Sequence, residues 1–414
     1  MDSSHEGVIE ALDGFVSEFD IERPPDYRAK RGADESVLKL VEREGVLLVD
    51  EGGGRRQSAR DRGTRGADDV IWQSSLEKLE QAQVGAFLEK LDRKLTPHQG
   101  LRCLHEGSFV EGATVPTEGR VLLLVHGTFS NAESFISGLK ENPDGDAFLG
   151  WCDESYDAVL SFDHPTLSVS PMLNAHALSQ AFAGSSAATD VICHSRGGLV
   201  TRWYLEALHQ GNPADNRAVF VGSPLAGTGL AAPPNIKGSL SLLSNIGSAI
   251  GTAASLIPFG VVVGGIFKVV SSVTKLAART PAIDAAVALI PGLIAQSRVG
   301  NNAELLSQRR SVAPIENRYF GVEANFESEQ VGWKFWKYFR DIGGRAMDIG
   351  ADVVFEGAND LVVDTGSMTE FSADVKLPAD QVLDFGTTDK VHHTNYFHHA
   401  ETVAFIREKL SQPR

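Results

Sequence analysis

Residues 190–208 read DVICHSRGGLVTRWYLEAL, and their pattern predicts a strand that turns directly into a helix. An apolar run predicts a strand over 189–193, the small polar segment HSRGG follows, and the chain then continues with helical character. A serine at such a strand-to-helix turn is strained, and its hydroxyl is exposed at a helix N-terminus. The turn needs small residues two positions before and after the serine, and Cys193 and Gly197 meet that need. Ser195 is therefore predicted to be a nucleophile.

The rest of the chain after residue 115 alternates short apolar runs with helical segments. This alternation is typical of a mostly parallel sheet covered by helices on both faces, so the predicted fold class is α/β. Strands are predicted over 121–125, 158–162, 189–193, 218–221, 319–322, 352–355 and 382–385. Helices are predicted over 131–140, 171–183, 197–209 and 399–410.

The composition narrows the classes of function. Of 414 residues, 42% are hydrophobic and 22% charged, so the chain can bury a substantial core. The 38 Lys and Arg residues and 54 Asp and Glu residues give a net charge of −16, which argues against a nucleic-acid partner held through its phosphates. The three cysteines are too few for a disulfide framework. The N-terminal segment lacks the features of a secretory signal peptide, so we expect a cytoplasmic location, with non-classical export left open.

Residues 1–114 are expected to form an N-terminal extension. Within it, the apolar run 46–49 predicts a strand, and 51–69, with five glycines and five arginines, predicts a flexible basic loop. Ser74 and Glu77 fit a helix capping box, and apolar residues then recur at helical spacing until residue 97. One amphipathic helix is therefore expected at the end of the extension.

Beyond the serine motif, the sequence resembles the α/β-hydrolase superfamily, and within it the lipase-like branch. The G-x-S-x-G motif of this family is present as CHSRG, with Cys193 at its first position. Upstream, VLLLVHGTF (121–129) is similar to the strand and His-Gly pair that precede the oxyanion hole of lipases, and VFVGSPLAGT (219–228) is similar to the strand and loop that follow their nucleophile helix. The resemblance covers residues 115–411 and implies one catalytic domain with the α/β-hydrolase fold.

A serine hydroxyl needs a histidine to take its proton and a carboxylate to orient that histidine. In this superfamily the acid and then the histidine follow the serine along the chain. The resemblance implies Asp360 as the acid, with Asp364 as its nearest rival, and His393 as the base, ranked above His392. The four histidines within 392–399 allow a metal site as an alternative, but no acidic or cysteine ligands accompany them at a recognisable spacing. We therefore expect no metal, and because the glycine runs lack a P-loop lysine and a dinucleotide-binding fingerprint, we expect no cofactor either.

The resemblance also implies an oxyanion hole, formed by the backbone N–H groups of Thr128 and Arg196, with Phe129 as a further candidate. Each such donor contributes about 3 kcal/mol to stabilising the transition state. Two simpler interpretations stay open. The glycine at 127 could serve only a tight turn after a buried strand, and Asp360 could only accept backbone N–H groups in a turn.

Residues 228–300 are expected to form an apolar helical cap or lid, inserted where lipase-like hydrolases place one. Its most apolar part, 250–267, has the minimum length for a membrane span, but Pro258 and four glycines interrupt it, which favours a folded insertion. Five bases against one acid give the insertion a net charge of +4 on an otherwise acidic chain. This polarity allows the cap to contact an anionic lipid surface as a peripheral membrane partner.

Three functions are consistent with these residues. The first is a serine carboxylester hydrolase that acts on small-molecule esters or lipids with apolar acyl groups. The second uses the same triad as a phospholipase, thioesterase or amidase, because the triad does not specify the leaving group. The third is a membrane-associating scaffold protein with a degenerate hydrolase fold. Activity toward simple esters separates the first two from the third.

Overall fold

The computed structural model describes residues 8–10, 12–13, 36–53, 69–76, 81–212, 215–232, 235–250, 290–298, 302–310, 318–340, 354–355 and 357–413. Contacts within the chain divide it into two compact units. One comprises residues 1–91, 233–289 and 330–354, and the other comprises residues 92–232, 290–329 and 355–414. The larger second unit carries all the residues predicted to form the site.

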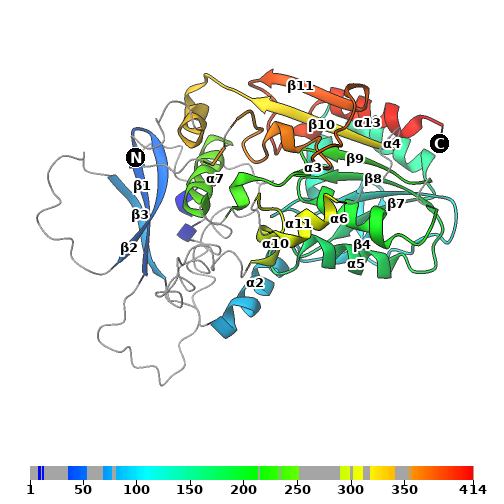
Figure 1. Ribbon diagram of the computed structural model, residues 1–414, viewed down its shortest axis with the longest axis horizontal. Helices are drawn as coiled ribbons and strands as arrows, with labels where there is room; N and C mark the ends of the chain where they lie inside the picture. The colour runs from blue at the N-terminus through cyan, green and yellow to red at the C-terminus, as the bar shows by residue number, and fades with distance from the viewer. Residues whose placement is uncertain are drawn as a thin grey trace, which may run out of the picture. The chain divides into compact units, whose positions relative to one another are not determined.

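The larger unit is built on a mostly parallel eight-stranded sheet with the order β11-β10-β9-β8-β6-β7-β4-β5 (Figure 1). This is the strand order of the α/β-hydrolase fold, and it confirms the predicted fold class. The strands are β4 (Gly100–His105), β5 (Ser108–Val110), β6 (Arg120–Val125), β7 (Ala158–Asp163), β8 (Ala188–His194), β9 (Arg217–Val221), β10 (Tyr319–Phe326) and β11 (Val382–Thr388). The antiparallel strand β4 begins the sheet ahead of the boundary expected at residue 115.

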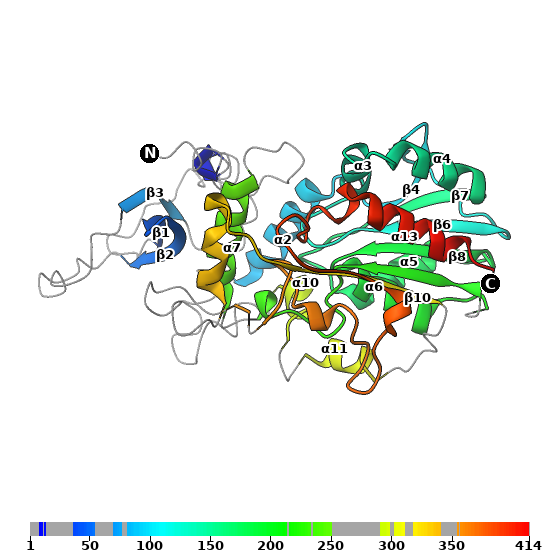
Figure 2. The same ribbon diagram turned by 90° about the horizontal axis from the view of Figure 1, so that it is seen from above.

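Helices cover both faces of this sheet (Figure 2). One face buries apolar side chains against α3 (Glu133–Lys140), α4 (Gly145–Ser155) and α13 (Ala400–Ser411). The other face buries them against α5 (Pro171–Ala181), α6 (Gly197–Trp203) and the π-helix η2 (Tyr204–Leu208), which continues α6. Short helices α10 (Pro291–Ile294) and α11 (Ala303–Gln308) belong to the same unit. The central strands are buried on both faces, which explains their continuous apolar runs.

The register of the parallel strands fixes where the functional loops emerge. Val125 at the end of β6 pairs with Cys193 of β8, and Val221 at the end of β9 pairs with His194 of β8 and Val322 of β10. The loops after β6, β8 and β9 therefore leave the sheet side by side, at the carboxyl ends of these strands. Active sites of open α/β sheets lie at the carboxyl ends of the strands.

The smaller unit holds a three-stranded antiparallel sheet of β1 (Ser36–Arg43), β2 (Val46–Gly53) and β3 (Asp69–Leu76), in the order β2-β1-β3. Side chains of α7 (Ile236–Ile250) hold β2, because Asn245 Oδ1 accepts the N–H of Leu47 and Ser241 Oγ accepts that of Val49. The 3₁₀ helix η6 (Val331–Phe339) contacts α7 in the same unit. The strand expected over 46–49 is thus confirmed as part of β2.

Two expectations differ from the structure, and two others fall mostly outside the described residues. Ser74 lies inside strand β3, so the capping box is wrong, and helix α2 begins later, at Gln81, and ends at Leu95. Val354 and Phe355, the described part of the strand expected over 352–355, belong to neither sheet. Most of the basic loop (54–68) and most of the cap (251–289) lie outside the described residues. In the part that is described, no helix combines the length and apolarity needed to cross a membrane.

Candidate active site

The turn at Ser195, the candidate nucleophile, has the strained geometry that its sequence predicts. Ser195 follows β8 and has a φ of +53°, in the left-handed region that disfavours residues other than glycine. Its backbone N–H donates to the Val221 carbonyl at 2.9 Å, which fixes the turn to the end of β9. A Cβ at Gly197 would lie 2.3 Å from the Val125 carbonyl oxygen, so the turn requires glycine there. The strained turn holds the serine at the carboxyl ends of the strands, where the loops after β6, β8 and β9 leave the sheet.

Cys193 occupies the first small position of the turn and is fully buried. Its Sγ lies 3.4 Å from the Val219 carbonyl oxygen. Burial raises the pKa of this thiol to about 12, so it remains protonated and is not a nucleophile. Cysteine thus serves here as a small packing residue in place of glycine.

Asp360 and His393 form a buried, hydrogen-bonded pair. Nδ1 of His393 lies 2.8 Å from Oδ2 of Asp360, and the His393 backbone N–H donates to the Asp360 carbonyl at 3.0 Å. The other carboxylate oxygen, Oδ1, accepts the N–H groups of Val362 and Val363 at 3.1 and 2.8 Å. Tyr396 donates its hydroxyl to Oδ2 at 2.9 Å. The acid is therefore completely desolvated and held by donors on both oxygens.

The strand ends bring this pair beside the nucleophile turn. Phe326, the last residue of β10, donates its N–H to the Asn359 carbonyl and so anchors the loop that carries Asp360. Gly222 comes directly after Val221, whose carbonyl accepts the Ser195 N–H. A Cβ at Gly222 would lie 3.2 Å from Asp360 Oδ2 and 3.3 Å from His393 Nδ1. His194 contacts the carbonyl of His393 through Nε2 at 2.8 Å. Serine, acid and histidine thus converge, although no hydrogen bond joins the Ser195 hydroxyl to His393 within the described structure.

The rival residues have other partners. Asp364 forms an ion pair with Arg298 at 3.2 Å, and His392 Nδ1 lies 3.1 Å from the Thr394 hydroxyl. His398 contacts Glu141 at 3.1 Å. Across the described residues, no group of three histidine, cysteine or acidic side chains is arranged to hold a metal ion. The structure therefore brings Asp360 and His393, rather than Asp364 and His392, to each other.

The candidate oxyanion donors lie beside the serine. A Cβ at Gly127 would come within 2.7 Å of the Ser195 Cβ and 3.3 Å of its Oγ, so the backbone after β6 packs directly on Ser195. Within the described parts of the chain, neither the Thr128 nor the Arg196 N–H donates to a protein acceptor. The Phe129 N–H, in contrast, donates to the Thr166 hydroxyl at 3.3 Å and is occupied. Thr128 and Arg196 are therefore the available pair.

Gln296 supports this region, although no sequence motif marks it. Its amide Nε2 donates to the Thr128 hydroxyl and to the Gly292 carbonyl, both at 2.9 Å. Arg196 is fully buried, and its guanidinium donates to the Gly292 and Val169 carbonyls. Burial lowers the pKa of Arg196 to about 10, which still leaves it charged near neutral pH. The segment around α10 therefore contacts both residues of the candidate oxyanion hole.

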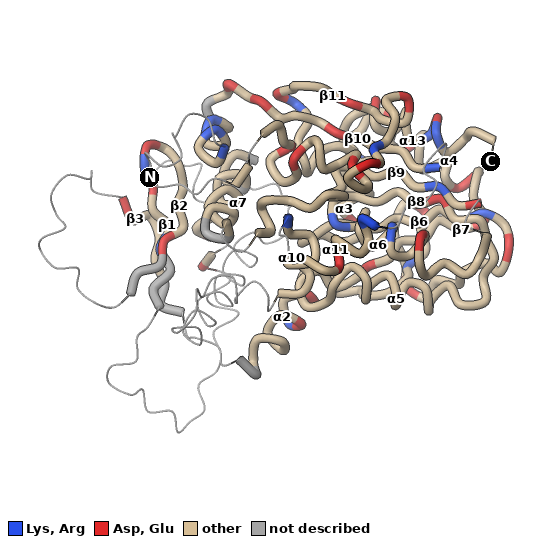
Figure 3. Tube along the Cα trace, in the orientation of Figure 1, with Lys and Arg blue, Asp and Glu red and all other residues tan. Residues whose placement is uncertain are grey.

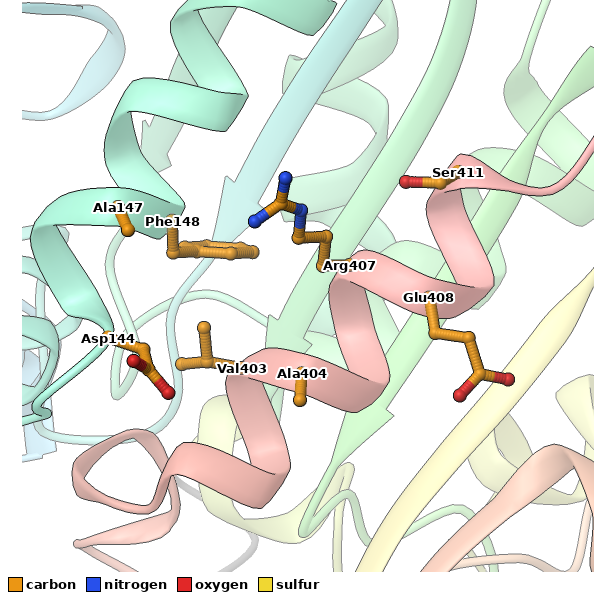
Figure 4. Close-up of a pocket in the computed structure, with 8 residues that line it drawn as sticks. All are labelled: Asp144, Ala147, Phe148, Val403, Ala404, Arg407, Glu408 and Ser411. Atoms are coloured by element: carbon orange, nitrogen blue, oxygen red, sulfur yellow. The ribbon is translucent and has the colours of Figure 1, made fainter.

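One surface groove is formed without the candidate catalytic residues. Acidic and basic residues are interspersed along the described elements (Figure 3). A groove between α4 and α13 is lined by Phe148, Val403 and Arg407 among others (Figure 4), and it contains none of the candidate catalytic residues.

The family model described as "Domain of unknown function (DUF7379)" matches residues 96–411. The chain belongs to this family. No curated protein matches the sequence. The family match begins just before β4 and ends at the last residue of α13, so it spans the whole eight-stranded sheet and the candidate site.

Solved structures similar to this chain include two bacterial lipases. The mature form of lipase BlEst2 from Bacillus licheniformis is 15% identical, with a TM-score of 0.38, and the match covers 73% of this chain and 96% of the lipase. Lipase 1 from Pelosinus fermentans is 14% identical, with a TM-score of 0.42, and the match covers 71% of this chain and 99% of the lipase. The α/β-hydrolase fold of this chain is established by its strand order and register.

Proposed function

We propose that the chain is a serine hydrolase that cleaves carboxylic esters with apolar acyl groups through a Ser195-His393-Asp360 triad. The observation that supports this most is the strained Ser195 turn, which is tied to the end of β9 directly beside the buried Asp360–His393 pair. A strained serine and an oriented histidine in one place are the two requirements of nucleophilic acyl transfer. The nucleophile–base hydrogen bond commonly tightens only when substrate binds.

In the proposed reaction, Ser195 Oγ attacks the acyl carbon while Nε2 of His393 accepts the hydroxyl proton. The Thr128 and Arg196 N–H groups stabilise the negative oxygen of the tetrahedral intermediate, each by about 3 kcal/mol. The intermediate collapses, and the alcohol leaves with the proton from His393. Water then attacks the acyl-enzyme, again with His393 as base, and releases the carboxylic acid and the free serine. Asp360 holds the histidine in its tautomer throughout.

The preference for apolar acyl groups rests on the composition of the cap. Each CH₂ group of an acyl chain that is buried gains about 0.8 kcal/mol, so an apolar cap that contacts the acyl chain favours long substrates. A series of p-nitrophenyl esters from butyrate to palmitate tests this preference. We expect kcat/KM to rise with chain length.

Replacement of the nucleophile tests the proposed chemistry. Ser195→Ala is expected to abolish ester hydrolysis, whereas Ser411→Ala, which changes an exposed serine near the C-terminus, should leave it intact. Equal rates for the two variants would contradict the proposal. Hydrolysis of thioesters or amides in preference to esters would keep the triad but replace the substrate class.

A further inference from the structure

We propose that His126 is the positioning residue of the oxyanion hole, and that it acts by fixing the direction of the Thr128 N–H. This inference rests on the proposed function, because an oxyanion donor has a role only if Ser195 attacks a carbonyl. His126 belongs to the His-Gly pair that follows β6, and the proposed triad mechanism assigns it no role.

The hydrogen bond from the His126 side chain to the backbone of the next residue, Gly127, sets the direction of one peptide group. Nδ1 of His126 lies 2.9 Å from the carbonyl oxygen of Gly127. A carbonyl oxygen only accepts, so Nδ1 carries the proton and donates. The peptide joining Gly127 to Thr128 is trans, and in a planar trans peptide the C=O and N–H point in opposite directions. The histidine that holds the carbonyl on one side therefore directs the Thr128 N–H to the other side.

The tautomer of His126 is fixed by a second bond. The backbone N–H of His164 donates to Nε2 of His126 at 3.0 Å, so Nε2 is an acceptor and cannot carry a proton at the same time. The His126 ring is 1% exposed and stacks on the His164 ring with centroids 4.1 Å apart. Burial lowers the pKa of His126 to about 4, and this effect outweighs the bond to Gly127, which acts in the opposite direction. The ring therefore stays neutral with its proton on Nδ1.

The directed donor lies next to the nucleophile. Gly127 packs against the Cβ and Oγ of Ser195, so the peptide held by His126 lies beside the serine. The Thr128 N–H has no protein acceptor within the described structure. The side chain of the same residue is separately held, because Gln296 donates to its hydroxyl at 2.9 Å. A donor that is fixed in direction but unoccupied is the arrangement that electrostatic preorganisation requires.

Two substitutions separate the bonds of His126. In His126→Asn, the amide nitrogen takes the place of Nδ1 and can still donate to the Gly127 carbonyl, but the acceptor for His164 is lost. In His126→Gln, the longer side chain can offer an oxygen at the place of Nε2, but the donor to Gly127 is lost. Each variant removes one buried hydrogen bond, so their losses of stability should be similar. His105→Gln, at an exposed position at the end of β4, is the matched control.

The experiment measures kcat and KM for p-nitrophenyl butyrate, melting temperature, and affinity for an alkyl boronic acid, which forms a tetrahedral adduct with the serine. We expect kcat of His126→Gln to fall at least tenfold below that of His126→Asn, with KM changed less than threefold and boronate affinity reduced in parallel. Equal kcat values, or kcat that follows melting temperature, would overturn the proposal. Inactivity of the wild-type protein would instead refute the proposed function.

A measurement on the wild-type protein keeps the inference testable if a variant does not fold. Nitrogen-15 NMR of the labelled full chain distinguishes the two histidine tautomers. We expect His126 to be neutral and protonated on Nδ1 from pH 6 to 9. Protonation on Nε2 would overturn the proposal without reference to any activity.

Discussion

Tyr396 donates its hydroxyl to Oδ2 of Asp360 at 2.9 Å, and this is the same oxygen that His393 contacts. Both Tyr396 and Asp360 are completely buried. Burial and the carboxylate raise the pKa of Tyr396 well above its ordinary value, so the hydroxyl keeps its proton and remains a donor. The Asp360 carboxylate is thus held by a side chain three residues beyond the histidine with which it pairs.

Tyr396→Phe should therefore impair catalysis as well as stability. A hydrogen bond to a charged group contributes about 1.5–3 kcal/mol, and its loss also frees Asp360 to move. We expect the free energy of unfolding to fall by about that amount and kcat/KM to fall roughly tenfold, as measured by denaturant unfolding and ester hydrolysis. Tyr156→Phe is the matched control, because Tyr156 donates to buried Asp190 at 2.8 Å away from the site. An equal loss of activity in both variants would show a purely structural effect.

The two adjacent histidines should differ sharply. His393 contacts Asp360, whereas His392 contacts Thr394, so only the first can serve as an oriented base. His393→Ala is expected to lower kcat by about 10⁴-fold, in line with loss of a triad member. His392→Ala should lower it much less. Steady-state kinetics of the two variants decide this, and similar kcat values would mean that His393 is not the base.

Glycine in the nucleophile turn should not tolerate a side chain. The methyl group of Gly197→Ala would lie 2.3 Å from a backbone oxygen, so the turn must shift, and overpacking of this kind costs about 1–3 kcal/mol. We expect a lower melting temperature and loss of activity. In Gly150→Ala, the methyl group meets no atom within 4 Å on helix α4, so this control should be slightly stabilised and fully active. A stable, active Gly197→Ala protein would refute the turn geometry.

Glu323 makes the stability of the protein depend on pH. Burial and the carboxylate of Asp384, its pairing partner on β11, raise the pKa of Glu323 to about 7, while Thr369 and Lys376 lower it. The folded state therefore binds this proton more tightly than the unfolded chain, whose glutamate has a pKa of about 4.5. Stability contributed by the protonated group is present below about pH 4.5 and is lost as the pH rises through about 7.

Glu323→Gln mimics the protonated acid and should remove this loss. We expect the melting temperature of the variant to exceed that of the wild type at pH 8, while the two converge at pH 4.5. Thermal unfolding at both pH values tests the sign. A difference that does not depend on pH would show that Glu323 titrates normally.

Much of the fold can be predicted from the sequence because the central strands are buried on both faces. Their continuous apolar runs identify β6 to β9 without ambiguity. The hairpins β1–β2 and β4–β5 are not among the predicted elements, although each has a local signal. In both, a Glu-Gly pair lies between the strands, at 44–45 and 106–107, with positive φ at both residues. This pair is typical of a tight two-residue hairpin turn.

The candidate site is only partly predictable from the sequence. Ser195 stands in a recognisable strand-to-helix turn motif, and Asp360 and His393 are candidates because their local patterns resemble those of the α/β-hydrolase superfamily. Gln296 stands in no pattern, and its role depends on how α10 lies next to the loop after β6, which is a tertiary contact. The direction of the Thr128 N–H likewise depends on the side-chain bond of His126 rather than on the residue types alone.

Ser195 is tested most directly as the nucleophile by covalent labelling of the full-length protein with a fluorophosphonate, followed by peptide mass spectrometry. Attack by the activated serine displaces fluoride and leaves the phosphonyl group on its oxygen. The proposed mechanism predicts rapid, stoichiometric labelling at Ser195, with no label in Ser195→Ala and slow labelling in His393→Ala. An unlabelled Ser195 in the folded wild-type protein, or a label on another residue, would contradict it.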